Sequence, residues 1–293
     1  MLFSAKRFLI SAGVLTAAAC GGSDSGLPNI TVPPHGHVFI VVEENTNYAS
    51  VVGTGAMPYL DTLISRYGLA TQYYASTHPS IGNYFMLTVG TTVTNDNTFA
   101  DTIRVDNIVR HLVAAGKTWK SYADSLPSVG YTGPPVGQYV RRHNPLTYLS
   151  DVTDNPAQKQ RLVPFTQFAA DLAGDTLPAY SFIVPNLCHD AHDCPLDSAD
   201  TWLRSNIKPL IQSARFQQDG MLIIVFDESA NDNMYGGGRV VWVVVSAKAK
   251  AGYQSTMVYA HQSTLRLTLR ALGLTSYPGA GVAAADMGEF FLP

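Results

Sequence analysis

The chain has 293 residues, of which 46% are hydrophobic and 14% are charged, so it is long enough to bury a large core. The net charge is −3 and the isoelectric point is near 6.2. These values argue against nucleic acid as a partner, because nucleic-acid-binding proteins usually carry a basic patch.

The N-terminal segment has the features of a targeting signal. Lys6 and Arg7 precede a short apolar run that ends in three alanines and Cys20, which is typical of a bacterial lipoprotein signal over 1–20 with lipidation of Cys20. An ordinary secretory peptide cleaved before Cys20 is the alternative. Residues 21–36 are predicted to be a flexible tether. We therefore expect an exported protein, either secreted or a cell-envelope lipoprotein of the periplasm or outer membrane, that contacts the membrane only through its N-terminal lipid anchor.

Continuous apolar runs alternate with helical patterns along the rest of the chain. In chain order we expect a strand at 37–42, a helix at 57–68, a helix at 106–116 with Asp106 as its N-cap, and strands at 118–122, 179–184, 221–226 and 240–246, followed by a helix at 262–274. Buried strands that alternate with helices indicate an α/β fold with a mostly parallel central sheet and helices on both faces. We expect one domain over 37–293, with 124–176 as a small cap or an elaborated loop region.

Polar residues follow three of these buried strands. Glu44 and Asn45 follow the first strand, and Asp227 and Glu228 follow the strand at 221–226; the strand at 179–184 is followed by a segment that contains Asp190 and His192. In parallel sheets, ligands bind beyond the carboxyl ends of the strands. Carboxylates crowded at one edge repel each other, and a multivalent cation held by carboxylate and imidazole relieves that repulsion.

Two cysteines remain after Cys20, in the segment CHDAHDC. In an oxidising compartment Cys188 and Cys194 are expected to form a disulfide that closes a tight loop. A metal site that uses both thiolates is the alternative.

Several segments together resemble the bacterial phosphoesterase family of the alkaline phosphatase superfamily, which contains secreted acid phosphatases and phospholipases C. The resemblance covers about residues 37 to 276 and is carried by these segments in order: VFIVVEENTNYASVVG, THPSIGNYFMLTVG, RRHNPLTYL, LPAYSFIVPNLCHDAHDC, MLIIVFDES and YAHQSTLRLTLRALGL. It implies an alkaline-phosphatase-like fold and one or two divalent metal ions.

The resemblance also implies roles for individual residues. Ser80 stands at the position of the nucleophile, Asn83 at that of a donor to a phosphoryl oxygen, and His143 at that of a histidine near the phosphate. Its implied metal ligands are Glu44, Asn45, Asp227 and Glu228 at one site and Asp190, His192 and His261 at a second cluster.

The stretch THPSIGNY, 77–84, places Ser80 between Pro79 and Gly82, which we expect to shape a turn. A serine hydroxyl needs activation, and metal coordination provides one route. The alternative for Ser80 is a helix N-cap, and Thr77 and His78 are secondary candidates for the chemistry.

We expect an exported acid phosphatase that hydrolyses phosphate monoesters of small molecules or lipid headgroups. Two alternatives remain open at this point: a phosphodiesterase of the phospholipase C type, and a non-catalytic surface lipoprotein.

Overall fold

The apolar runs form the centre of one twisted sheet in the computed structural model, which describes residues 1–2 and 31–292. Its strand order is β4-β3-β5-β1-β6-β7-β2-β8. Within the described residues the strands are β1 (His37–Glu43), β2 (Gly68–Tyr74), β3 (Trp119–Ala123), β4 (Leu162–Pro164), β5 (Tyr180–Val184), β6 (Gly220–Phe226), β7 (Trp242–Val245) and β8 (Gln254–Ala260).

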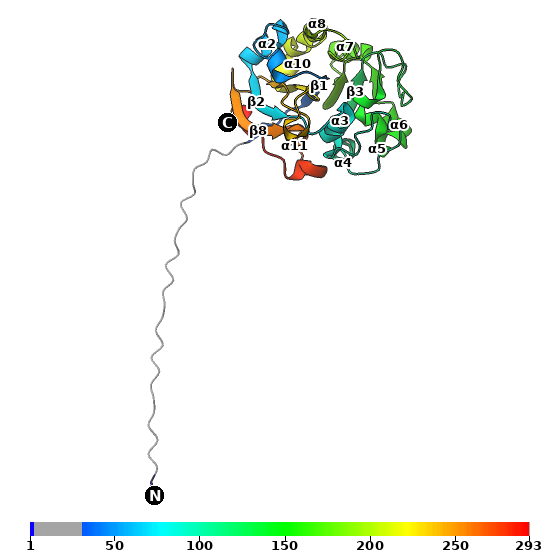
Figure 1. Ribbon diagram of the computed structural model, residues 1–293. Coiled ribbons are helices and arrows are strands. Elements are labelled where there is room, and N and C mark those ends of the chain that lie inside the picture. The colour runs from blue at the N-terminus through cyan, green and yellow to red at the C-terminus, as the bar shows by residue number, and fades with distance from the viewer. Residues whose placement is uncertain (3–30, 293) are drawn as a thin grey trace.

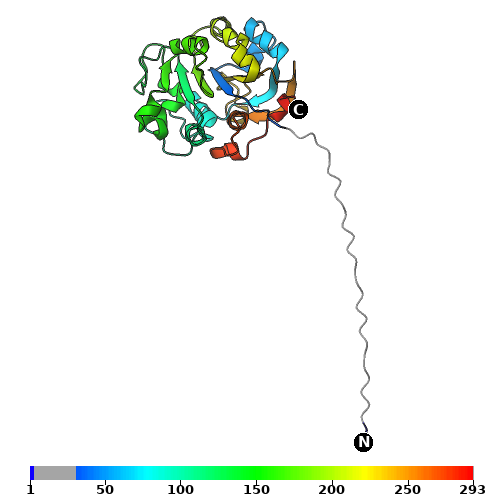
Figure 2. The ribbon, with the colours of Figure 1, turned by 180° about the vertical axis from the view of Figure 1, so that it is seen from behind.

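Helices cover both faces of this sheet, as expected for strands without an alternating pattern (Figure 1). The described helices are α1 (Tyr48–Val51), α2 (Pro58–Arg66), α3 (Ser80–Val89), α4 (Ile108–Ala114), α5 (Ser150–Thr153), α6 (Pro156–Lys159), α7 (Thr166–Ala173), α8 (Leu196–Asn206), α9 (Lys208–Gln212), α10 (Ala214–Asp219) and α11 (His261–Ala271). Helix α2 packs with α8, and α3 packs with α11. Seen from behind in Figure 2, these two pairs again lie on opposite sides of the strands.

The central strands are parallel, which confirms the predicted fold class. β1 pairs in parallel with β5 on one side and with β6 on the other. The departure is β7, which is antiparallel to both β6 and β2. A parallel return needs a crossover, usually a helix, whereas the connection from β6 to β7 contains only the short 3-10 helix Met234–Gly236.

The predicted helix at 106–116 is shorter than expected and has a different cap. It spans Ile108–Ala114, and the side chain of Asn107 accepts a hydrogen bond from the backbone N–H of Arg110. Asp106 was therefore the wrong N-cap. The predicted helix at 57–68 ends at Arg66, and Gly68 begins β2.

The polar stretch at 124–176 supplies part of the sheet as well as surface loops. It contains the short 3-10 helices Arg141–His143 and Pro145–Tyr148, helices α5 to α7, and the edge strand β4. β4 pairs in parallel with β3. The C-terminal part of this region therefore extends the sheet, and its N-terminal part forms loops around the site.

The N-terminal predictions fall largely outside the described residues. The signal segment 1–20, Cys20 and residues 21–30 of the tether lie there. Within the tether, His35 is buried and its Nε2 lies 3.0 Å from Ser246 Oγ, so the packed structure begins before residue 37. The helices among residues 1–2 and 31–292 include none that is both long and apolar enough to span a membrane.

Candidate active site

Four carboxylates meet at the carboxyl edge of the three central strands. Glu44 follows β1, Asp190 lies on the loop after β5, and Asp227 and Glu228 follow β6. Because β5, β1 and β6 are parallel neighbours, these loops emerge side by side. All four side chains are buried, with at most 4% exposed. Buried carboxylates in such number are costly unless a cation or donors compensate them.

Ser80 lies in the middle of this group. It is the first residue of α3, and its hydroxyl lies 3.1 Å from Glu44 Oε2 and 2.9 Å from Glu228 Oε1. The N-cap position belongs to Pro79, and the cap makes no side-chain hydrogen bond. The alternative of Ser80 as a helix N-cap is therefore wrong. Its hydroxyl is directed into the carboxylate cluster instead.

Asn83 fixes the backbone that precedes Ser80, and its predicted role as a donor to a phosphoryl oxygen stays a prediction. Its Oδ1 accepts hydrogen bonds from the backbone N–H groups of Ser76 (2.9 Å) and Thr77 (3.3 Å), and its Nδ2 donates to Thr77 O (2.8 Å). The side chain is fully buried. The amide therefore holds the loop that leads to Ser80, and one of the two N–H groups of Nδ2 is used for this.

Gly82 lies inside α3, so the prediction of a turn at this residue was wrong. A Cβ atom added there would stand 2.4 Å from Asn95 Oδ1 and 2.6 Å from Thr77 Cγ2. The glycine allows two loops to approach the first turn of the helix closely.

His143 joins the cluster from the 3-10 helix Arg141–His143. Its Nδ1 lies 3.2 Å from Asp190 Oδ2 and its Nε2 lies 3.1 Å from Glu44 Oε1. Its ring stacks on Tyr84, with centroids 5.1 Å apart and planes 5° from parallel. The ring is thus fixed between two carboxylates that follow different strands.

A metal ion fits the donors that this edge presents. Ligand atoms of Glu44, His143 and His192 lie within 4.8 Å of one another. Asp227 Oδ2 and His143 Nε2 are buried atoms to which no described residue gives an aligned hydrogen bond. A donor set that combines carboxylate and imidazole suits zinc or iron better than it suits magnesium or calcium, which prefer oxygen ligands alone. These residues therefore form a candidate metal centre.

Burial perturbs the titration of these groups in one consistent direction. Burial, and then the neighbouring carboxylates, raise the pKa values of Glu44 and Asp227 well above their usual range. Burial raises the pKa of Asp190 to about 7, and burial lowers the pKa of His143 well below its usual range. Each shift disfavours charge, and a bound cation would reverse it for the carboxylates.

Asn45 and His261, two of the predicted metal ligands, make hydrogen bonds to the residues around them. Asn45 has a positive φ of 46°; its backbone N–H donates to Asp227 Oδ1 (3.1 Å) and its Nδ2 donates to Glu44 Oε2 (3.0 Å). His261 Nε2 donates to the Asp227 carbonyl at 2.6 Å, and its Nδ1 lies 3.1 Å from the hydroxyl of Tyr73. The structure therefore removes His261 from the second metal cluster, because both of its ring nitrogens are occupied.

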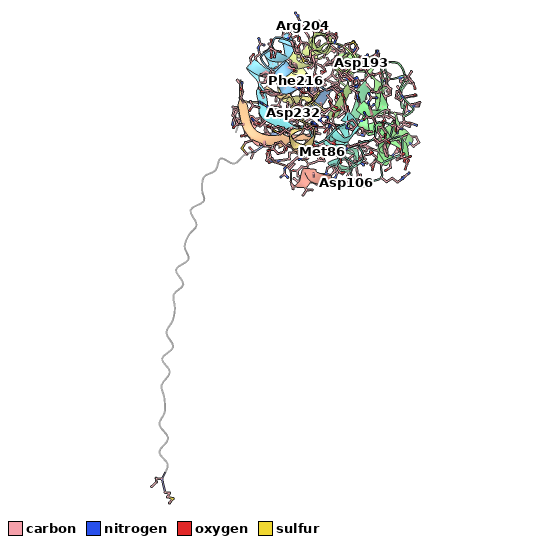
Figure 3. The ribbon with its side chains drawn as sticks, in the orientation of Figure 1. Met86, Asp106, Asp193, Arg204, Phe216 and Asp232 are labelled. Carbon is pink, nitrogen blue, oxygen red and sulfur yellow. A yellow bond between two sulfur atoms is a disulfide. The ribbon has the colours of Figure 1, made fainter. Side chains whose placement is uncertain are left out.

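The disulfide between Cys188 and Cys194 is present, as predicted, with Cα atoms 4.6 Å apart. It closes the loop that carries Asp190 and His192. On this loop the His192 backbone N–H donates to Asp190 Oδ1 at 2.9 Å, and His192 Nδ1 lies 2.6 Å from a carboxylate oxygen of Asp193, labelled in Figure 3. His192 Nε2 remains directed toward the site.

Tyr84 and Arg142 were not placed by the sequence, and His78 was expected only as a secondary candidate. Tyr84 donates from its hydroxyl to Glu44 Oε1 at 2.7 Å. His78 pairs through Nδ1 with Glu228 and through Nε2 with the carbonyl of Asp232 (3.1 Å), a residue labelled in Figure 3. Arg142 Nη2 lies 3.4 Å from His192 Nε2. His78 and Tyr84 both belong to THPSIGNY, and Arg142 directly precedes His143, so their proximity in sequence to predicted site residues was the available signal.

Comparison with known proteins identifies the family of the chain. A sequence model of the phosphoesterase family matches residues 54–275. The chain is 29% identical over 276 residues to the phosphatidylinositol-3-phosphatase of Mycobacterium tuberculosis, over 92% of this chain and 89% of that protein. It is 31% identical over 274 residues to an acid phosphatase of Aspergillus fumigatus, over 89% of this chain and 60% of that protein.

Solved structures share the fold at low sequence identity. The lipoteichoic acid synthase LtaP of Listeria monocytogenes superposes with a TM-score of 0.60 at 12% identity, over 89% of this chain and 76% of that one. A protein of the alkaline phosphatase superfamily from Vibrio parahaemolyticus gives a TM-score of 0.58 at 16% identity, over 85% and 69%. The fold is thus of the alkaline-phosphatase type. The chain belongs to the phosphoesterase family, as its segments indicated, and it is a hydrolase of the phosphatase type.

Proposed function

We propose that the chain is an exported acid phosphatase that hydrolyses phosphate monoesters with Ser80 as its nucleophile. The observation that carries this proposal is the position of the Ser80 hydroxyl, within 3.1 Å of both Glu44 and Glu228 at the start of α3. A hydroxyl needs a neighbouring base or a cation to attack at ordinary pH. Either carboxylate is placed to accept its proton.

In the proposed reaction, Ser80 Oγ forms a bond to phosphorus and the bond from phosphorus to the alcohol oxygen breaks. The serine proton passes to Glu228 and from there to the departing alcohol oxygen, so that the carboxylate is restored. A water molecule then attacks the phosphoserine, which releases phosphate and restores the hydroxyl. The N-terminus of α3, a helix of 10 residues, favours the phosphate anion electrostatically.

We propose that Glu44, His143 and His192 hold a divalent metal ion, with Asp190 and Asp227 beside it. When bound, such an ion supplies positive charge that stabilises a phosphoryl group in transfer. Asn45 fixes the carboxylates of Glu44 and Asp227 through hydrogen bonds, and Tyr84 fixes the second oxygen of Glu44. The chain itself thus orients the ligands from behind.

The substrate class and the location rest on independent support. Similar proteins are named acid phosphatase and phosphatidylinositol-3-phosphatase, so the proposed substrates are phosphorylated small molecules and lipid headgroups. Export is supported by the N-terminal signal pattern and by the disulfide between Cys188 and Cys194, a bond typical of oxidising compartments. The lipid anchor at Cys20 remains part of this proposal.

The test is a panel of phosphomonoesters and phosphodiesters, assayed across pH with the wild type and with Ser80→Ala. We expect monoesters to be preferred and Ser80→Ala to lose at least ~10³-fold in turnover, the range seen when a nucleophile is removed. Wild-type protein quenched during turnover should carry phosphate on Ser80.

Ser246→Ala is the matched control, because Ser246 is also a buried serine with a side-chain partner but lies beyond β7, away from the carboxylate cluster. It should retain turnover close to that of the wild type. Retention of more than about a tenth of the activity by Ser80→Ala, a barrier change below ~1.4 kcal/mol, would show that Ser80 is not the nucleophile. A preference for diesters would instead support the phospholipase C type of reaction.

A further inference from the structure

A groove of about 720 Å³ lies beside the carboxylate cluster. One wall is formed by residues 97–100, which follow α3, and the other by residues 132–135 and the segment around Arg142. The proposed chemistry at Ser80 uses none of these residues except for the contact between Arg142 and His192. The groove therefore needs its own explanation.

The groove is joined to the site at two points. Asn97 lines it, and Asn97 Oδ1 accepts a hydrogen bond of 3.4 Å from the backbone N–H of Ile81, the residue after Ser80. Arg142 also lines it, and its guanidinium reaches to 3.4 Å from His192. These two contacts place the groove next to the first turn of α3 and next to the loop that carries His192.

The lining combines apolar residues with uncharged polar residues and two arginines. Phe99, Pro134, Pro135 and Tyr148 line the groove, and no carboxylate does. Phe99 is half-buried and stacks on Tyr148 with centroids 5.8 Å apart. Both rings also meet Phe85 of α3, at 6.2 Å and 5.4 Å. These contacts attach the apolar floor of the groove to the helix that begins with Ser80.

The two arginines that line the groove differ in how many of their donors are already paired. Arg141 is fully engaged: its guanidinium lies 4.0 Å from the centre of the Tyr148 ring and donates to the carbonyls of Ala100 and Thr147. Arg142 has no carboxylate partner among the described residues, and its buried Nε has no hydrogen-bond partner there. Its free charge lies where the groove meets the site, which suits a phosphate oxygen.

We propose that this groove binds the alcohol part of the substrate and selects phosphomonoesters whose alcohol carries an aromatic ring or an apolar group of similar size, with Arg142 contacting the phosphate. This inference rests on the proposed function at Ser80. It adds a specificity determinant, since an apolar pocket favours a substrate that fills it by roughly tenfold or more.

The test compares 2-phenylethyl phosphate with ethyl phosphate, because both release a primary alcohol and differ only in the ring. The wild type should prefer the former in kcat/KM by ~10- to 100-fold. Phe99→Ala should reduce that ratio at least ~5-fold. Ala100→Trp, which fills the groove from an exposed position, should reduce it as well and serves if Phe99→Ala does not fold. Phe165→Ala, at a half-buried phenylalanine outside the groove, is the matched control and should leave the ratio unchanged.

A second measurement separates the groove from the chemistry. Calorimetric binding of the two esters to Ser80→Ala protein should show the same preference, and Ala100→Trp on that background should remove it. If the wild type hydrolyses both esters with equal kcat/KM, the proposed role of the groove is wrong, whereas the proposed function is unaffected. A wild type that hydrolyses neither overturns the proposed function, and the binding preference then decides the groove alone.

Discussion

Replacing Asn83 by alanine distinguishes two roles for this residue by their different consequences. The side chain makes three hydrogen bonds, all to the backbone of Ser76 and Thr77, and is fully buried. A hydrogen bond between neutral groups contributes about 1 kcal/mol, and buried groups left without a partner cost at least as much. Asn83→Ala should therefore lower the free energy of unfolding by roughly 3 kcal/mol.

The assay is urea denaturation followed by circular dichroism, with turnover measured in parallel on the folded fraction. Asn107→Ala is the matched control. Asn107 is also fully buried and makes three hydrogen bonds, to Val105, Arg110 and Asp151, on a part of the chain away from the carboxylate cluster. Both variants should lose similar stability, whereas only Asn83→Ala should also lose turnover, because the loop before Ser80 is released.

One result would refute this reasoning. In this result, the free energy of unfolding of Asn83→Ala lies within ~0.5 kcal/mol of the wild-type value, well below the loss expected for three hydrogen bonds. Turnover nevertheless falls by more than about a hundredfold, which corresponds to about 2.7 kcal/mol in the activation barrier. The Asn83 amide would then bind substrate. The role implied by the family resemblance would then be correct, and the loop would be held by other contacts.

Three further predictions concern pH, metal and the disulfide. Burial, and then Lys248, lower the pKa of His35 to about 4, although Asp219 opposes the shift. Between about pH 6.5 and 4 the folded state therefore binds fewer protons than the unfolded state. The contribution of His35 to stability is complete above about pH 6.5 and falls by up to about 3 kcal/mol as the pH drops toward 4. In urea titrations His35→Gln should flatten this fall, and an equally steep fall in the variant would assign it to other groups. Elemental analysis of active protein should show at least one divalent metal ion per chain, and chelation should abolish turnover; full activity in metal-free protein would contradict the ligand assignment. Replacing Cys188 and Cys194 with serine should cost about 2 kcal/mol of stability or less, because the closed loop is short, and should lower activity more strongly; unchanged activity would show that the loop is held without the bond.

The central strands could be predicted because their sequences leave little choice. Runs such as MLIIVF have no polar face, so they must be buried on both sides, and this placed β1, β5 and β6 correctly. β2 and β8 were missed because their composition is mixed, and β8 is an edge strand with most of its side chains exposed. β7 is antiparallel because no crossover helix in the described part of the chain connects it to β6, and the apolar pattern of the strand itself does not show its direction.

The site was predictable to the extent that it follows from sheet topology. Glu44, Asp190 and Asp227 converge because parallel strands end at one edge. His261 and Asn83 could not be resolved in this way, because a residue's position does not tell which polar atoms the surrounding backbone already uses. Arg142 was missed for a related reason, since its contact depends on how two loops meet.

The first five residues of helix α3 have different roles. The hydroxyl of Ser80 faces the carboxylates, and Gly82 leaves room for two loops to pack closely against the helix. Asn83 hydrogen-bonds to one of these loops, and Tyr84 contacts both Glu44 and His143. These side chains share one rigid axis, so a small rotation of the helix displaces all of them together. The apolar residues on its far side, such as Phe85, therefore set the alignment of the reacting atoms without touching them. Across variants of this chain, substitutions in the buried packing around α3 should lower turnover in proportion to the tilt of the helix that they cause. This loss should appear at substitutions that are too mild to unfold the protein.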